Sequence, residues 1–206
     1  MTAIPFATRV ICYCLGTKGQ LDLRGKRSRP WLKLRRSELE RTYLDHQVRM
    51  LRRLHPQPGS FKVHWNRLGA DSVYDDLVAE FTCPELWGAY DLLYPRDRRR
   101  ITSEALVAVG LPGLAAAWLD EGERNPQSAK LRLFGPGPSD VEILGWIESL
   151  GVPGRIAPGP RLQMSLAFDQ WQADTLVRQI RPLVHRSMAY RLRPAAPGAR
   201  ALYAGF

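Results

Sequence analysis

The sequence predicts an α+β protein made of two tandem copies of one small unit. The predicted elements of both halves follow the same order, αββαββα. The glycines that end the first predicted helix of each half, Gly19 and Gly122, lie 103 residues apart. Short runs with one apolar and one cationic face recur in both halves. Repetition of element order at a fixed offset indicates an internal duplication, and we expect a monomer with an internal pseudo-two-fold axis.

Composition and charge limit the class of protein. The chain has 206 residues, of which 45% are hydrophobic, enough for a buried core in one domain or two small ones. Lys and Arg number 30 against 20 Asp and Glu, a net charge of +10 that favours a polyanionic partner such as nucleic acid. No apolar run approaches the ~18 residues of a membrane span, and no secretory signal is visible, so we expect no membrane association and no secretion.

Three cysteines, Cys12, Cys14 and Cys83, form no C-x-x-C pair. An odd count without ligand spacing argues against a disulfide framework or a zinc site. We therefore expect small buried core residues in a reducing compartment.

In the first half we expect a helix over 9–19, two strands within 20–36, a helix from Ser37 to Leu54, a loop over 55–60, a hairpin of 61–67 and 73–81, and a helix over 85–93. The second strand alternates with period two: Leu32 and Leu34 face one way, Lys33 and Arg35 the other. Such a strand has one apolar and one cationic face. Ser37 is the expected N-cap of the following helix.

In the second half we expect a helix over 111–121 ended by Gly122, a strand over 130–134, a helix over 141–150 capped by Ser139, strands at 155–156 and 162–166, and a helix over 169–180. Lys130 and Arg132 repeat the cationic face of the first half. The charged run 96–100 is the predicted boundary. We divide the chain into an N-terminal half at 1–95, a basic linker and lead-in at 96–109, a C-terminal half at 110–193 and a tail at 194–206.

The segment 114–122, Leu-Ala-Ala-Ala-Trp-Leu-Asp-Glu-Gly, resembles the motif of the LAGLIDADG homing endonuclease family. Tyr94-Pro95 with the basic residues that follow, and the closing segments 180–184 and 187–192, are similar to further signatures of the family. The resemblance covers about residues 9–193 and indicates the single-chain form with two motifs, of which the first, 11–19, is degenerate.

The resemblance implies two motif helices packed side by side, an acid at the end of each helix that binds divalent metal, and a saddle of two sheets that follows nucleic acid. Ala115, Ala116 and Ala117 suit the close helix packing. Basic side chains on the strands, turns and linker are the nucleic-acid-binding candidates: Lys18, Arg24, Lys26, Arg27, Arg29, Lys33, Arg35, Lys62, Arg98, Arg99, Arg100, Lys130, Arg132, Arg155 and Arg161. The alternative to nucleic-acid binding for a charged run such as 98–100 is a solvent-exposed linker without a binding role.

The first motif departs from the family pattern at the acid. Counted back from Gly19, the position of the metal-binding acid is occupied by Lys18, whereas its counterpart is Glu121 with Asp120 beside it. A lysine repels a cation and supplies no oxygen ligand. We therefore expect double-strand cleavage to be lost, with Glu121 vestigial. Glu121 and Asp120 would bind Mg²⁺ only in an active enzyme, and binding alone requires no cofactor.

The resulting hypothesis is a LAGLIDADG-derived protein that binds structured RNA without cutting it. It would be a component of an organellar ribosome, in contact with ribosomal RNA and neighbouring ribosomal proteins, or a factor like an intron-splicing maturase. The mitochondrion is the favoured location, with the bacterial cytoplasm as the alternative. Competing hypotheses are a Mg²⁺-dependent homing endonuclease or nickase that uses Glu121, a DNA-binding regulator, and a basic scaffold whose likeness to a nuclease is ancestry alone.

Tryptophans beside nucleic-acid-binding strands invite a stacking role. Trp118 and Trp146 fall on apolar helix faces, and we expect them in the core. Trp31 and Trp65, next to the predicted saddle strands, are left open between stacking and packing.

Overall fold

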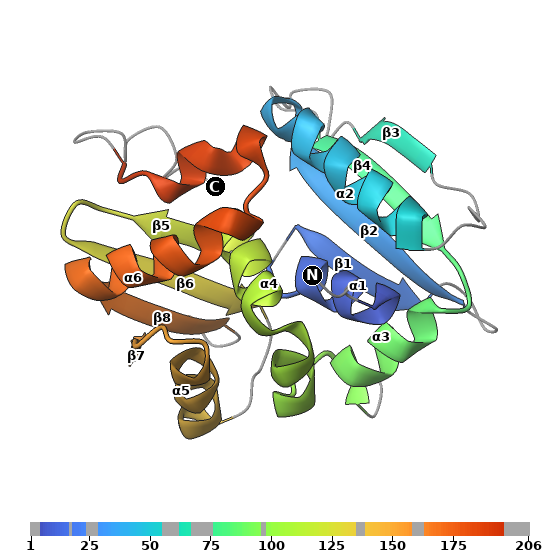
Figure 1. Cartoon of the computed structure of the whole chain (residues 1–206). Coiled ribbons are helices and arrows are strands. Elements are labelled where there is room, and N and C mark those ends of the chain that lie inside the picture. The colour runs from blue at the N-terminus through green and yellow to red at the C-terminus, as the bar shows by residue number, and fades with distance from the viewer. Residues whose placement is uncertain are drawn as a thin grey trace.

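The computed structural model describes residues 5–16, 18–23, 29–54, 62–66, 76–95, 98–134, 139–157 and 163–195. Two antiparallel four-stranded sheets lie on either side of a central pair of helices, α1 and α4 (Figure 1). The predicted α+β class and the duplicated order of elements are both confirmed.

The first half contains α1 (Phe6–Cys14), β1 (Gly19–Leu23), β2 (Pro30–Ser37), the 3-10 helix η1 (Glu38–Glu40), α2 (Arg41–Leu54), β3 (Lys62–Asn66), β4 (Asp76–Thr82) and α3 (Leu86–Leu93). Its strands lie in the order β1-β2-β4-β3. The helix α2 turns Leu44 and Leu51 inward, and it packs on the face of the sheet that presents Leu32 and Leu34.

The second half contains α4 (Ser103–Glu121), β5 (Gly122–Arg124), β6 (Ser128–Phe134), α5 (Asp140–Ser149), β7 (Arg155–Ala157), β8 (Gln163–Asp169), α6 (Gln170–Ile180), and the 3-10 helices η3 (Arg181–Leu183) and η4 (Arg186–Leu192). Its order, β5-β6-β8-β7, is that of the first sheet. Gly19 pairs with Leu34, and Gly122 pairs with Leu131. The two sheets therefore share strand order and register.

The parts of the two motif helices that lie at the centre of the molecule are buried. In α4 every residue from Gly113 to Asp120 is buried, as are Val10 to Cys14 in α1. The small side chains of Ala115 to Ala117 permit the close packing that the resemblance implies. Gly16, two residues past the end of α1, lies so close to α4 that a Cβ atom there would lie 2.5 Å from the Cβ of Asp120.

The end of the first motif helix was predicted wrongly. The helix α1 stops at Cys14, and Gly19 begins β1 instead of capping the helix. Gly19 is needed for close approach, because a Cβ atom there would lie 1.9 Å from the carbonyl oxygen of Tyr13. The glycine was therefore a correct signal for a special position but not for a helix end.

Other boundaries shift as well. β2 runs on through Ser37, whose side chain makes no capping hydrogen bond, and a 3-10 turn precedes α2. α4 begins at Ser103, eight residues before the predicted start, and it breaks at Gly110, whose φ of 49° favours glycine. The caps at Ser139 and Asp169 are full capping boxes. The predicted loop over 55–60 and the tail after 195 lie outside the described residues.

The tryptophans and cysteines that were expected in the core are buried. Trp118 is fully buried and Trp146 is 6% exposed. Cys12, Cys14 and Cys83 are buried free thiols. Within the described part of the chain, no helix is both long and apolar enough to cross a membrane.

Candidate nucleic-acid interface

Strand β2 presents cations on the outward face of the first sheet. Leu32 and Leu34 are buried, whereas Lys33 and Arg35 are partly exposed on the opposite face, as the period-two pattern predicted. The Lys33 Nζ atom lies 4.0 Å from the Glu80 carboxylate and 5.9 Å from the centre of the Trp31 ring. Trp31 is therefore a half-buried neighbour of the cationic face.

Strand β6 repeats this arrangement in the second sheet. Lys130 and Arg132 are partly exposed, whereas Leu131 and Leu133, which alternate with them, are buried. The shared register makes Lys130 the counterpart of Lys33, and Arg132 the counterpart of Arg35. The Arg132 guanidinium forms an ion pair with Glu123 on β5. The two sheets thus carry the same pair of cations at equivalent positions of their outward faces.

The remaining predicted contact residues are placed unevenly. Arg29, Arg98, Arg100 and Arg155 are exposed, and Lys18 is partly buried. Arg24, Lys26, Arg27 and Arg161 lie outside the described residues, and so do the side chains of Lys62 and Trp65.

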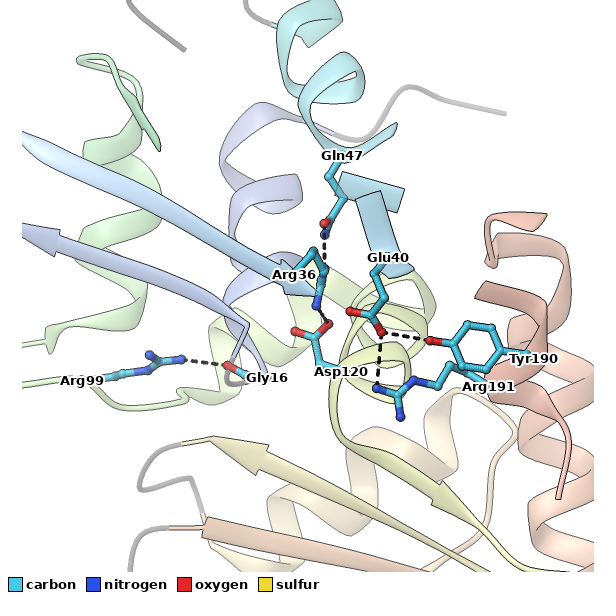
Figure 2. Close-up of polar contacts among 8 residues, drawn as sticks. All are labelled: Gly16, Arg36, Glu40, Gln47, Arg99, Asp120, Tyr190 and Arg191. Carbon is cyan, nitrogen blue, oxygen red and sulfur yellow. Dashed lines mark hydrogen bonds and ion pairs between the residues drawn. The ribbon is translucent and has the colours of Figure 1, made fainter. Parts of the chain in front are cut away.

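Arg99, predicted to contact phosphate, binds the end of the first motif helix. Its Nη2 donates to the carbonyl oxygen of Cys14 at 2.5 Å. The same atom donates to the carbonyl oxygen of Gly16 at 3.4 Å (Figure 2). Carbonyls at a helix C-terminus lack partners within the helix and carry partial negative charge, which a guanidinium satisfies. Arg99 is thus a structural contact from the linker to α1.

At the end of the second motif helix, Asp120 faces a buried arginine. Arg36 Nη1 lies 2.7 Å from Asp120 Oδ1, and each side chain is 2% exposed (Figure 2). The Arg36 Nε atom donates to Gln47 Oε1 at 3.1 Å. Because Arg36 lies on β2 and Asp120 on α4, this ion pair joins the two halves.

Burial raises the pKa of Asp120, and the facing Arg36 guanidinium opposes that shift. Burial alone would lower the pKa of Arg36, but the facing Asp120 carboxylate raises it above the ordinary arginine value. A neutral Asp120 would leave the buried guanidinium without a counter-charge, a costly arrangement. Of the two acids of the second motif, Asp120 is therefore engaged in a contact inside the protein.

The counterparts of the pair show that it breaks the internal symmetry. By the strand register, Arg36 corresponds to Leu133, a fully buried aliphatic residue. Arg36 is thus a charged residue at a position where the second half has an apolar core residue.

The closing segment η4 adds a second polar contact between the halves. Tyr190 Oη donates to Glu40 Oε1 at 3.0 Å, and Arg191 Nη2 lies 3.6 Å from the same oxygen (Figure 2). The Trp118 indole Nε1 donates to the Arg191 carbonyl oxygen at 3.1 Å. Residues near the C-terminus therefore bind both the second motif helix and the first half.

The residues at the two motif ends do not fit a divalent cation. Lys18 stands at the first acid position, and its carbonyl oxygen accepts the Arg35 backbone N–H at 2.8 Å. Asp120 is engaged by Arg36, which leaves the partly buried Glu121 as the remaining motif carboxylate. In the described ranges no group of three or more His, Cys, Asp or Glu side chains could hold a metal ion.

Sequence reasoning missed Arg36 and its partners. The available signal was the alternation of the strand. Arg36 lies two residues after Leu34, which lies two after Leu32, so all three side chains fall on the core face of β2. A charged residue on such a face requires a buried partner. The identity of that partner, Asp120, depends on how the two halves pack.

Solved structures show the same fold. The chain is similar to the homing endonuclease I-WcaI bound to its DNA recognition sequence, with a TM-score of 0.68 and 14% identity over 95% of this chain and 90% of that one. It is similar to I-DmoI in complex with DNA and calcium, with a TM-score of 0.55 and 14% identity over 98% of both chains. A variant I-DmoI complex with nicked target DNA in the presence of manganese gives a TM-score of 0.56 and 11% identity over 87% and 98%.

These similarities establish that the chain has the fold of the LAGLIDADG homing endonucleases. No protein-family model and no curated protein sequence matches the chain.

Proposed function

We propose that this protein binds structured RNA across the outward faces of its two sheets and does not cleave it. The duplicated cation pairs, Lys33 with Arg35 and Lys130 with Arg132, support the binding surface. Cations at equivalent positions of two symmetric sheets can contact two stretches of a phosphate backbone. The fold is the one that I-WcaI uses on its DNA sequence.

The residues at the ends of the two motifs are the observation that supports the absence of cleavage. Hydrolysis of a phosphodiester through divalent metal needs carboxylates that hold the ion against the developing charge. Here Lys18 occupies the position of the first motif's acid, and Asp120 forms an ion pair with Arg36 at 2.7 Å. Glu121 alone supplies too few ligands for the metal centre that such chemistry requires.

The choice of RNA rests on the kind of contact the surface offers. Twenty-five of the 30 basic residues are arginines, whose planar fork suits bidentate phosphate contacts and stacking. Double-stranded RNA is recognised mainly through shape and backbone contacts. We place the protein in a ribonucleoprotein, as a component of a mitochondrial ribosome beside ribosomal RNA and ribosomal proteins, or as a factor like an intron-splicing maturase.

A second candidate is a Mg²⁺-dependent site-specific DNA endonuclease or nickase that uses Glu121. The fold similarity to endonucleases solved with DNA and divalent metal favours it. So does the position of Glu121 at the end of the second motif helix.

One competition experiment separates the two candidates. The full-length protein is titrated with a labelled RNA hairpin against unlabelled duplex DNA at matched salt, with and without Mg²⁺, and the strands are then analysed for breaks. We expect tighter binding to the hairpin and intact strands. Preference for duplex DNA, or a Mg²⁺-dependent cut that Glu121→Gln abolishes, would overturn the proposal.

A further inference from the structure

A second cationic surface lies away from the sheet faces, where the two halves meet. It consists of Arg9, Arg49, Arg53 and Arg186 around the paired rings of His46 and His185, and we call it the seam cluster. Its members come from α1, from α2, and from the start of η4 with the preceding His185. It therefore combines residues of both halves, and neither half contains it alone.

Stacked rings form the centre of the seam cluster. The rings of His46 and His185 lie 4.4 Å apart between centroids, with an interplanar angle of 27°. His185 Nδ1 is hydrogen-bonded to Ser187 Oγ at 2.8 Å, which fixes its ring. His46 lies on α2 and His185 precedes η4, so the stack holds the arginines of the two halves close together.

The arginines of α2 point away from the sheet. His46, Arg49 and Arg53 follow one another at spacings of three and four residues, which places them on one stripe of the helix. Arg49 and Arg53 are exposed, whereas Leu44 and Leu51 are fully buried against the sheet. The stripe therefore lies on the opposite side of the first half from Lys33 and Arg35.

The elements around the seam cluster are strongly cationic. Helices α1 and α2 and the segment 181–192 contain eight arginines and one acid, Asp45. The adjoining Glu40 binds Tyr190 and Arg191. Arg41 is paired with Glu38 and Arg191 with Glu40, whereas Arg49, Arg53 and Arg186 are exposed.

Electrostatics show that these charges converge on the rings. Burial lowers the pKa of His46 to about 4, helped by His185, Arg49, Arg9 and Arg53. Burial, Arg186 and Arg49 lower the pKa of His185. Both imidazoles are consequently neutral near pH 7, and the arginines repel one another across them.

We propose that the seam cluster is a second phosphate-binding site, which takes the backbone of a second RNA segment while the sheets hold the first. Guanidinium groups from two halves, spaced around neutral rings, can donate paired hydrogen bonds to successive phosphates. Bound phosphate relieves the repulsion between the arginines. The protein then bridges two RNA segments on opposite sides of one fold, and this inference rests on the proposed function of the sheets.

A two-step capture experiment tests the bridge. An immobilised RNA hairpin captures the full-length protein, and a second hairpin with a different label is then supplied at matched salt. We expect the wild type to retain the second hairpin. Arg49→Gln/Arg53→Gln and Arg186→Gln should each lower that retention, the double variant by about tenfold, with capture on the first hairpin nearly unchanged.

Two controls make the result specific. Arg178→Gln removes an exposed helical arginine outside the cluster and should retain the second hairpin as the wild type does. Lys130→Gln/Arg132→Gln should weaken the first capture. Circular dichroism confirms that each variant is folded, as expected for changes at exposed positions.

The proposal is overturned if the wild type does not retain the second hairpin, or if the cluster variants retain it as well as Arg178→Gln does. Failure of the proposed function looks different. In that case the sheet variant captures the first hairpin as well as the wild type, and the cluster variants alone weaken that capture.

Discussion

The Arg36–Asp120 ion pair is the residue-scale feature that most distinguishes the two halves. It occupies a position where the counterpart of Arg36 is Leu133, and it uses an acid that neighbours the motif carboxylate Glu121. A buried pair of this kind contributes little net stability compared with apolar packing, but removal of one partner is costly.

We expect Arg36→Leu to destabilise the fold by about 3–5 kcal/mol, because it leaves the Asp120 carboxylate buried without a counter-charge. The double variant Arg36→Leu/Asp120→Asn should recover a large part of that loss. Urea unfolding of the wild type, both single variants and the double variant measures the coupling. A loss in the double variant equal to the sum of the two single losses would show that the two side chains are not coupled.

The His46–His185 stack predicts a dependence of stability on pH. The folded-state pKa of His46 is about 4, below the ordinary histidine value of 6.5. Between these values the unfolded chain binds a proton that the folded protein does not, so the free energy of unfolding falls as the pH falls from 6.5 towards 4. Thermal unfolding across this range should show a shallower decline in His46→Gln than in the wild type. Parallel curves for the two proteins would contradict the assignment.

At the scale of elements, the sequence was most informative where one face of an element is buried. Period-two alternation predicted β2 and β6 with their correct faces, because Leu32 and Leu34 had to point into the core. It did not predict the end of α1, because Gly19 serves close approach to the Tyr13 carbonyl and not a helix cap. It also did not predict the role of Arg99, since a charged linker looks the same in sequence whether it is solvated or bound.

The close approach of α4 to the segment that follows α1 makes Gly16 sensitive to substitution. In Gly16→Ala the new Cβ would lie 2.5 Å from the Asp120 Cβ and 2.7 Å from its Oδ2. We expect a loss of about 1–3 kcal/mol from overpacking, measured by chemical denaturation. Gly145→Ala is the matched control, because its Cβ meets nothing within 4 Å on α5 and alanine favours the helix. Similar stability in both variants would argue against tight packing at Gly16.

The linker contact from Arg99 to α1 predicts another element-scale effect. Arg99→Gln removes charge-assisted hydrogen bonds to the Cys14 and Gly16 carbonyls and should cost about 1.5–3 kcal/mol. Its exposed neighbour supplies the comparison, since Arg98→Gln should change stability by less than about 0.5 kcal/mol. If RNA binding falls in Arg99→Gln without any loss of stability, the side chain contacts phosphate after all.

At the scale of the whole molecule, the proposed function depends on duplication for the binding surface and on asymmetry between the copies for the absence of cleavage. Lys130→Gln/Arg132→Gln should weaken binding to an RNA hairpin and reduce the slope of log affinity against log salt by roughly one for each phosphate that is no longer neutralised. Fluorescence anisotropy over a salt series measures the slope. Arg178→Gln should leave it unchanged, and an unchanged slope in the sheet variant would exclude these two residues from the interface.

The central claim, a LAGLIDADG fold that holds RNA without cutting it, is tested most directly by recovery of the tagged protein from its own cells. The bound nucleic acid is sequenced, and the eluate is incubated with Mg²⁺. The account predicts structured RNA in stoichiometric amount with intact strands, ribosomal RNA for a ribosomal component and intron RNA for a splicing factor. Recovery without RNA, together with a site-specific Mg²⁺-dependent cut of DNA, would contradict it and make the protein a nuclease that works through Glu121.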